Sequence, residues 1–317
     1  MKARSYRGVL MAGFQLYTGN FRRLFKGSWQ MALLYAACSG LLATLTAIKL
    51  PEITAALVMQ YEVYQTVSLQ LLRHYTITVL EAAGLSLLAI AAMSLASATI
   101  LALLRSHRNT GVVPTPPHWL TASPALMGRT LKGVFFTLLI LLLPLLGFVG
   151  LAALAETVSP QFVAHHIMTV TATFGICTAL ALALSLPLMH VLMKYLMEPA
   201  QGYWPTLRHN YGRALRHWGS LLLVFFLSLL LVSLASMVIM TPSLVLNLAN
   251  QQAHAGLLIG DPLGMPSYIL PLTFATAMLC NFIQFYISQA TLVHNYYSYG
   301  SIETQKNERE QQTPDML

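Results

Sequence analysis

Long stretches without a charged residue dominate this sequence of 317 residues. Six of them exceed the roughly 20 residues that an α-helix needs to cross about 30 Å of hydrocarbon. These windows are residues 28–48, 82–104, 133–155, 167–193, 217–260 and 262–302. Only 9% of all residues are charged, against about 25% in ordinary soluble domains. We therefore expect an all-α fold, a polytopic membrane helix bundle with six transmembrane helices.

The basic residues predict how this bundle is oriented. If the N-terminus is cytoplasmic, 16 of the 18 lysines and arginines lie on the inner side, and only Lys49 and Arg73 lie outside. This agrees with the positive-inside rule and predicts a multi-pass protein of the cytoplasmic (inner) membrane with both termini in the cytoplasm. Because the net charge of +8 follows the membrane spans, we expect no nucleic-acid partner.

The chain divides into three predicted segments. Residues 1–27 form a cytoplasmic amphipathic arm, in which apolar residues recur at helical spacing and Gly19-Asn20 indicates a break between two helices. Residues 28–298 form the six-span domain. Residues 299–317 are polar, lack apolar periodicity, and are expected to be a disordered cytoplasmic tail.

A short basic motif precedes spans one, three and five. It reads Arg, any residue, an apolar residue, then Arg or Lys, at residues 23–26, 129–132 and 213–216. The i, i+3 spacing places both cations on one helical face. We expect these cytoplasmic lead-in helices to contact lipid headgroups through Arg22, Arg23, Lys26, Arg129, Lys132, Arg213 and Arg216. Two interpretations stay open: three repeated hairpins, or basic flanks that every inward-starting span requires.

Polar groups inside the spans are the other candidate site. Ionisable residues in a span are functional candidates by default, and here they are Glu81, His190 and Lys194. Span six carries a polar seam at helical spacing, consisting of Thr273, Asn281, Gln284, Ser288, Thr291 and Asn295. We expect the seam to face the bundle interior, because unpaired amides in lipid cost several kcal/mol. It serves either as packing or as a solute pathway.

No motif of known catalytic chemistry is present. The sequence contains no phosphate-binding loop, zinc-binding helix or nucleophile elbow. We therefore predict no enzyme activity, no catalytic residues, no cofactor and no metal site. Cys38, Cys177 and Cys280 each fall in a span and are expected to be packing residues. Span two is rich in small residues, which predicts a central position.

The phrase Asn20-Phe21-Arg22-Arg23-Leu24-Phe25, the six-span layout and Gln284-Phe285-Tyr286 near the C-terminus resemble uncharacterised six-span membrane proteins of Bacteroidetes type. Those are similar to the membrane domain that accompanies some glycerophosphodiester phosphodiesterases. The resemblance covers residues of about 15 to 300. It implies a fold and a location, and it carries over no catalytic residues because the soluble domain of such enzymes is absent here.

The expected function is that of a scaffold or accessory protein that contacts membrane lipid headgroups or a partner. A protein partner or a second copy of the chain stays open. The alternative is a transporter or permease subunit whose path is lined by spans two, four and six.

Overall fold

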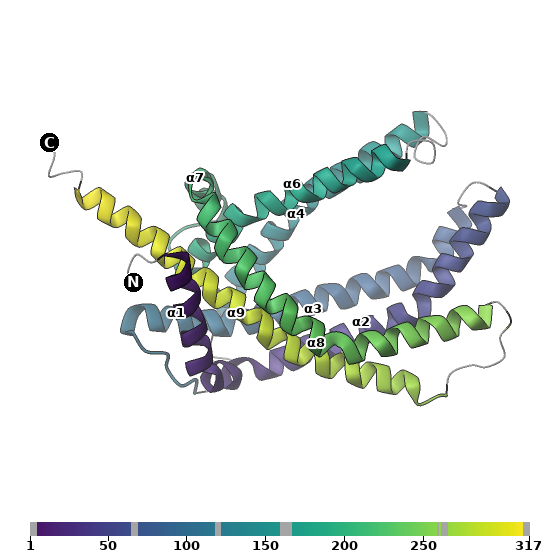
Figure 1. Cartoon of the computed structure of the whole chain (residues 1–317), viewed down its shortest axis with the longest axis horizontal. Coiled ribbons are helices and arrows are strands. Elements are labelled where there is room, and N and C mark those ends of the chain that lie inside the picture. Colours follow the sequence, from purple (N-terminus) through teal and green to yellow (C-terminus); the bar gives the residue numbers. More distant parts are fainter. Residues whose placement is uncertain are drawn as a thin grey trace.

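The computed structural model describes residues 5–64, 69–117, 122–158, 167–258, 260 and 266–312. These residues form helices joined by short connections, and no strand occurs among them (Figure 1). The helices are α1 (Tyr6–Gly19), α2 (Phe21–Tyr64), α3 (Leu69–Thr110), α4 (Pro124–Val158), α6 (Ile167–Met197), α7 (Tyr203–Arg216), α8 (Trp218–Leu258) and α9 (Ile269–Gln312). The predicted all-α class is confirmed.

Six of these helices are long and apolar enough to cross a membrane. The candidate spans are Phe21–Gln60, Arg73–Thr110, Pro124–Ala152, Met168–Met197, Trp218–Ala253 and Ile269–Glu308. Each contains most of one charge-free window, so the predicted architecture of a multi-pass membrane protein is confirmed.

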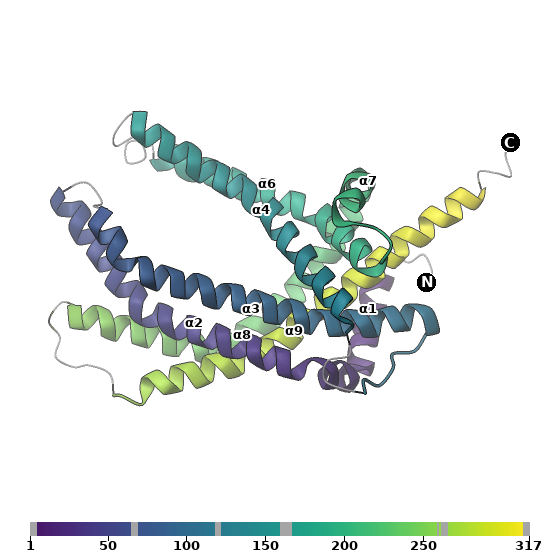
Figure 2. The same ribbon diagram turned by 180° about the vertical axis from the view of Figure 1, so that it is seen from behind.

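The spans pack as three hairpins, α2 with α3, α4 with α6, and α8 with α9 (Figures 1 and 2). We call the end of the molecule that carries both chain termini, α1 and α7 the terminal end. The opposite end, where each hairpin turns, is the hairpin end. Toward the hairpin end, the α4–α6 pair diverges from the α2–α3 pair (Figure 2).

Helix α9 is the element that holds the terminal end together. It packs against α1, α2, α6 and α8, and its side chains Phe285, Tyr296 and Tyr299 are among the largest that are fully buried. The hydroxyl of Tyr17 in α1 donates a hydrogen bond to the carbonyl of Tyr286. The hydrophobic core therefore lies near the terminal end.

Span two, for which small residues predict a central position, has the largest buried share of the six candidate spans. Small side chains such as Ala92, Ala96 and Ala98 are fully buried in α3, because they allow neighbouring backbones to approach closely. In the most apolar stretch of α3, 56% of the residues are buried, against 6% in α4. The leucine-rich surface of α4 is left for lipid.

The three basic lead-ins differ in structure. Those before spans one and three lie in the first turns of α2 and α4, which continue without a break through Gly27 and Gly133 into the apolar stretch that follows. Only the third is a separate helix, α7, which ends at its C-cap residue His217. The predicted break after Gly19 is confirmed: α1 ends there, with Asn20 as its C-cap residue, and α2 begins at Phe21.

The expectation of a disordered tail is wrong for residues 299–312, which continue α9. Ser301 is buried and Glu303 forms an ion pair with Lys194 of α6, so tertiary contacts hold the first turn of this segment. Glu, Gln and Lys residues, which dominate its remainder, are good helix formers. Residues 313–317 lie outside the described residues.

Close packing of α2 on α9 yields a first prediction. A Cβ atom added at Gly40 would lie 3.2 Å from the backbone nitrogen of Met278, whereas one at Gly84 would meet nothing within 4 Å. We expect Gly40→Leu to destabilise the protein by about 1–3 kcal/mol through overpacking. Thermal unfolding in detergent measures this, with Gly84→Leu as the matched control. Equal melting temperatures for the two variants would contradict the close approach.

Candidate functional site

Among the described residues, all lysines and arginines except Lys49 and Arg73 lie at the terminal end. Of the predicted headgroup contacts, Arg22, Lys26, Lys132, Arg213 and Arg216 are exposed. Arg23 is half-buried, and its guanidinium donates to the carbonyl of Val113 and to the side-chain oxygen of Asn20. Most of the predicted cations are thus available to a ligand at this end.

The guanidinium of Arg129, another predicted headgroup contact, is bound within the protein. It donates hydrogen bonds to the carbonyl oxygens of Tyr195 at 2.6 Å and of Glu198, Pro199 and Gln201 at 3.0 Å. It also stacks 4.1 Å from the centre of the Tyr195 ring. One of these carbonyls, that of Tyr195, belongs to the last turn of α6, and the other three lie in the connection to α7. Arg129 therefore caps the end of α6 and fixes the start of that connection.

Arg105 of α3 caps the same helix end from the other side. Its Nε donates to the carbonyl of Leu196 at 2.8 Å, and Nη2 contacts the same oxygen. The last four carbonyls of a helix lack intrahelical partners and carry the negative end of the macrodipole, which favours cations. We call Arg105 and Arg129 the arginine clamp.

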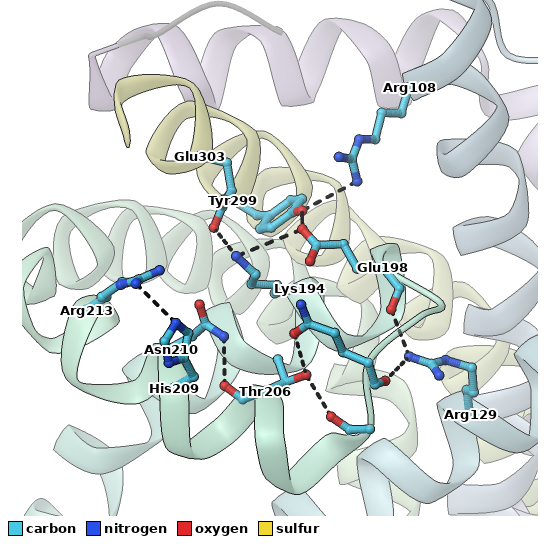
Figure 3. A network of polar contacts seen from close by, with 12 residues as sticks. Arg108, Arg129, Lys194, Glu198, Thr206, His209, Asn210, Arg213, Tyr299 and Glu303 are labelled. Atoms are coloured by element: carbon cyan, nitrogen blue, oxygen red, sulfur yellow. Dashed lines mark hydrogen bonds and ion pairs between the residues drawn. The ribbon is translucent and has the colours of Figure 1, made fainter. Parts of the chain in front are cut away.

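A buried ion cluster lies beside the clamp, where α6 meets α9 (Figure 3). Lys194 is only 5% exposed, and its Nζ lies 2.8 Å from Glu303 Oε1 and 3.9 Å from Glu198 Oε1. The Tyr299 hydroxyl donates to Glu198 at 2.7 Å and accepts from Arg108 at 3.4 Å. Each buried charge thereby has a partner, as burial requires.

The three predicted ionisable residues do not share one site. His190 lies one turn before Lys194 on α6, and its ring centroid is 5.8 Å from that of Tyr299. The imidazole is buried, and its Nδ1 has no hydrogen-bond partner among the described residues. Glu81 is exposed on α3, toward the hairpin end. His190 and Lys194 therefore lie together on α6 at the terminal end, and Glu81 lies far from both.

The predicted polar seam of α9 is divided in the structure. Thr273 accepts a hydrogen bond from Asn250 of α8 at 2.6 Å. Asn281 and Ser288 donate to carbonyls of α9 itself, and the buried Gln284 Oε1 has no partner among the described residues. Thr291 and Asn295 are half-buried. The seam does not form one continuous set of interhelical contacts.

Two other α9 residues, which the sequence pattern did not single out, bond to neighbouring helices. Gln289 accepts from Ser97 of α3 at 3.3 Å, and His294 Nδ1 lies 2.9 Å from the Ser228 hydroxyl of α8. Both side chains are almost fully buried. Glu198, Tyr299 and Glu303 were also missed. The only sequence signal for the two acids is that each follows the end of a charge-free window.

Two cavities flank the ion cluster. The first, which we call the cationic cavity, has a volume of about 500 Å³ and lies between α6, α7 and α9. Its wall includes His190, Asn210, Arg213, Arg216, Glu303 and Lys306. The second, of about 800 Å³, lies where α4 and α6 meet the start of α7. Its wall includes Arg129, Lys132, Phe136, Tyr195, Tyr203 and Trp204.

Aromatic stacking shapes the second cavity. The Phe136 ring packs against Tyr203 and Trp204 with centroid distances of 5.3 and 5.4 Å. The Tyr203 hydroxyl lies 2.9 Å from the Thr137 hydroxyl, and burial raises the pKa of this phenol. Tyr203 therefore stays neutral at physiological pH and positions α7 against α4.

Among the described residues, the cysteines form no disulfide and no metal-binding group is present. Cys38 and Cys280 are buried, Cys177 is half-buried, and all three are free, as expected of packing residues. In the described parts of the chain, no three His, Cys, Asp or Glu side chains gather in a group that could hold a metal ion. The groups that the terminal end offers to a ligand are cations and aromatic rings.

Comparison with protein-family models, curated proteins and solved structures finds no match to this chain. The resemblance to six-span membrane proteins of Bacteroidetes type therefore stays a prediction.

The arginine clamp yields a second prediction. Arg129→Gln removes charge-assisted hydrogen bonds to the end of α6, and we expect a loss of about 2 kcal/mol in stability. Lys132→Gln, one turn away and exposed, should change stability by no more than about 0.5 kcal/mol. Unfolding in detergent measures both. A larger effect at Lys132 would show that the clamp is not the stabilising contact.

Proposed function

We propose that this protein is a scaffold or accessory protein of the cytoplasmic membrane, with both termini in the cytoplasm. Its terminal end docks onto the anionic headgroups of the inner leaflet. The observation that carries this proposal is the concentration of exposed basic and aromatic side chains at that end, beside six helices long enough to cross the bilayer.

The start of α2 is the clearest example. Arg22 and Lys26 are exposed, and the aromatic side chains of Phe21, Phe25 and Trp29 beside them are 40%, 37% and 38% exposed. Aromatic rings favour the interface between headgroups and hydrocarbon. A cation near an anionic leaflet contributes about 1 kcal/mol. This pattern supports a surface that rests on the leaflet.

The proposed orientation is tested by labelling single cysteines in a protein whose three native cysteines are replaced. Ser267→Cys is exposed near the hairpin end, and Asn109→Cys is exposed at the terminal end. In intact cells, we expect an impermeant thiol reagent to label residue 267 and to spare residue 109. Permeabilised cells should give labelling at both positions. The opposite pattern in intact cells would refute the orientation.

The proposed docking is tested in lipid nanodiscs with and without phosphatidylglycerol. We expect the anionic lipid to stabilise the natural protein. The Arg22→Gln/Lys26→Gln variant should lose about 2 kcal/mol of that stabilisation. The control, Lys49→Gln/Arg73→Gln, removes two charges away from the terminal end and should retain it. An equal loss in both variants would contradict docking through this end.

The accessory role is tested separately in liposomes that contain the purified protein. Flux of a small solute without any partner would contradict a scaffold and favour the transporter. Capture of one stoichiometric partner from the membrane would support the scaffold.

A further inference from the structure

We propose that the cationic cavity is a binding site for a phosphate group, carried either by a lipid headgroup or by a soluble phosphate compound. This inference deepens the proposed function and rests on it for the lipid source, because docking would bring headgroups to the mouth of the cavity. A soluble phosphate compound can reach the cavity without docking.

The walls of the cavity come from three different helices. Helix α7 contributes Asn210, Arg213 and Arg216, α6 contributes His190, and α9 contributes residues on the turn around Glu303. Arg213 and Arg216 are three residues apart, which places them on one face of α7. A volume of about 500 Å³ is within the range of small-molecule sites, and it leaves room for more than a single phosphate.

The charges of the wall select an anion. Three cations, Arg213, Arg216 and Lys306, line the cavity with one carboxylate, that of Glu303. That carboxylate is already bound to Lys194 at 2.8 Å. Within the described residues, no ion pair joins Arg213 or Arg216 to an acid; Arg213 contacts the ring of His209 at 3.2 Å. Arg213 and Arg216 are therefore available to a ligand.

The buried imidazole of His190 forms part of the cavity wall. His190 is 5% exposed and lines this cavity, and its Nδ1 has no hydrogen-bond partner among the described residues. A buried polar atom left unpaired costs about 1–3 kcal/mol, and such atoms in native proteins usually have a partner. Because Nδ1 has almost no accessible surface, the imidazole shapes the wall, and the arginines supply the donors to a ligand.

Phosphate fits this set of donors better than a carboxylate does. Each guanidinium presents a planar fork that binds two phosphate oxygens at once. A phosphate ester presents two or three non-bridging oxygens in a tetrahedral arrangement, against the two coplanar oxygens of a carboxylate, so it can accept from Arg213 and Arg216 at once. The charge of the ligand would remain next to water, because both arginines are exposed.

The test uses the full-length protein purified in a neutral detergent. Inorganic phosphate is titrated calorimetrically, and bound phosphatidylglycerol is counted by native mass spectrometry. We expect Arg213→Gln and Arg216→Gln each to weaken phosphate binding about tenfold, and the double variant to abolish it. Arg208→Gln is the matched control, because Arg208 is an exposed arginine of α7 that does not line the cavity. It should bind as the natural protein does.

The outcomes distinguish the two sources of phosphate. Loss of one bound phosphatidylglycerol in the double variant, but not in Arg208→Gln, supports a lipid headgroup. Variant-sensitive binding of inorganic phosphate with an unchanged lipid count supports a soluble compound. Binding of both probes by the double variant as tightly as by the control would overturn the proposal. The variants change exposed residues, and melting temperatures without ligand verify that they fold.

The result is also separable from that of the docking experiment. If the double variant binds both probes normally while Arg22 and Lys26 still determine stabilisation by anionic lipid, the phosphate site fails and docking stands. If the arginines of α7 control phosphate binding while anionic lipid gives no stabilisation, docking fails and the cavity stands as a site for a soluble phosphate compound.

Discussion

Two arginines bind backbone carbonyls where α6 ends. The packing of the neighbouring helices at the terminal end depends on the position of this end of α6. Helix α6 packs chiefly against α4 and α7, and its hairpin diverges from α2 and α3 toward the hairpin end (Figure 2). Its attachment to α3 is therefore concentrated where Arg105 binds the carbonyl of Leu196, while Arg129 of α4 binds the carbonyl of Tyr195. Those carbonyls have no partner within the helix, and unpaired backbone groups are costly near a bilayer. Their capping also fixes where the chain turns into α7.

The ion cluster adds a second constraint at the same place. Lys194 is nearly inaccessible to water, so leaving it without a carboxylate would cost about 3–5 kcal/mol. Glu303 supplies that carboxylate from α9, which extends α9 beyond its apolar stretch and brings it against α6. Two sides of the cationic cavity are formed by His190 of α6 and by the turn of α9 around Glu303. The third side is α7, whose buried face holds Tyr203, Thr206, Asn210 and Ala214, leaving Arg213 and Arg216 exposed.

Glycine and alanine have the complementary role in the membrane-spanning part. At Gly40 the α2 backbone approaches Met278 of α9 so closely that a Cβ would be in tight contact. The buried alanines of α3 permit a similar approach on its inner face. Helices α4 and α8 instead expose leucines over most of their surface. The bundle thus has a closely packed part around α2, α3 and α9, and apolar surfaces suited to lipid elsewhere.

Much of this fold could be predicted from local patterns. Charge-free windows predicted the six spans, small residues predicted the burial of α3, and Gly19-Asn20 predicted the end of α1. These features depend on length, composition and the steric freedom of single residues, all of which are local. The site was predicted only in part. His190 and Lys194 were identified because an ionisable residue in a span is unusual, but their partner Glu303 was assigned to a disordered tail.

The amino-acid sequence by itself determined the helical class, the number of spans and the side of the bundle on which the basic residues gather. Only the tertiary structure decided which polar groups meet. Arg129 appears in the sequence to be one of several equivalent lead-in cations, yet it caps α6 because α4 and α6 lie side by side. Gln289 and His294, rather than the predicted seam as a whole, bond to neighbouring helices. Successive side chains of a helix point 100° apart around its axis, so a small rotation of the helix changes which of them are buried. That rotation depends on the combined packing of all the neighbouring helices, which no local pattern contains.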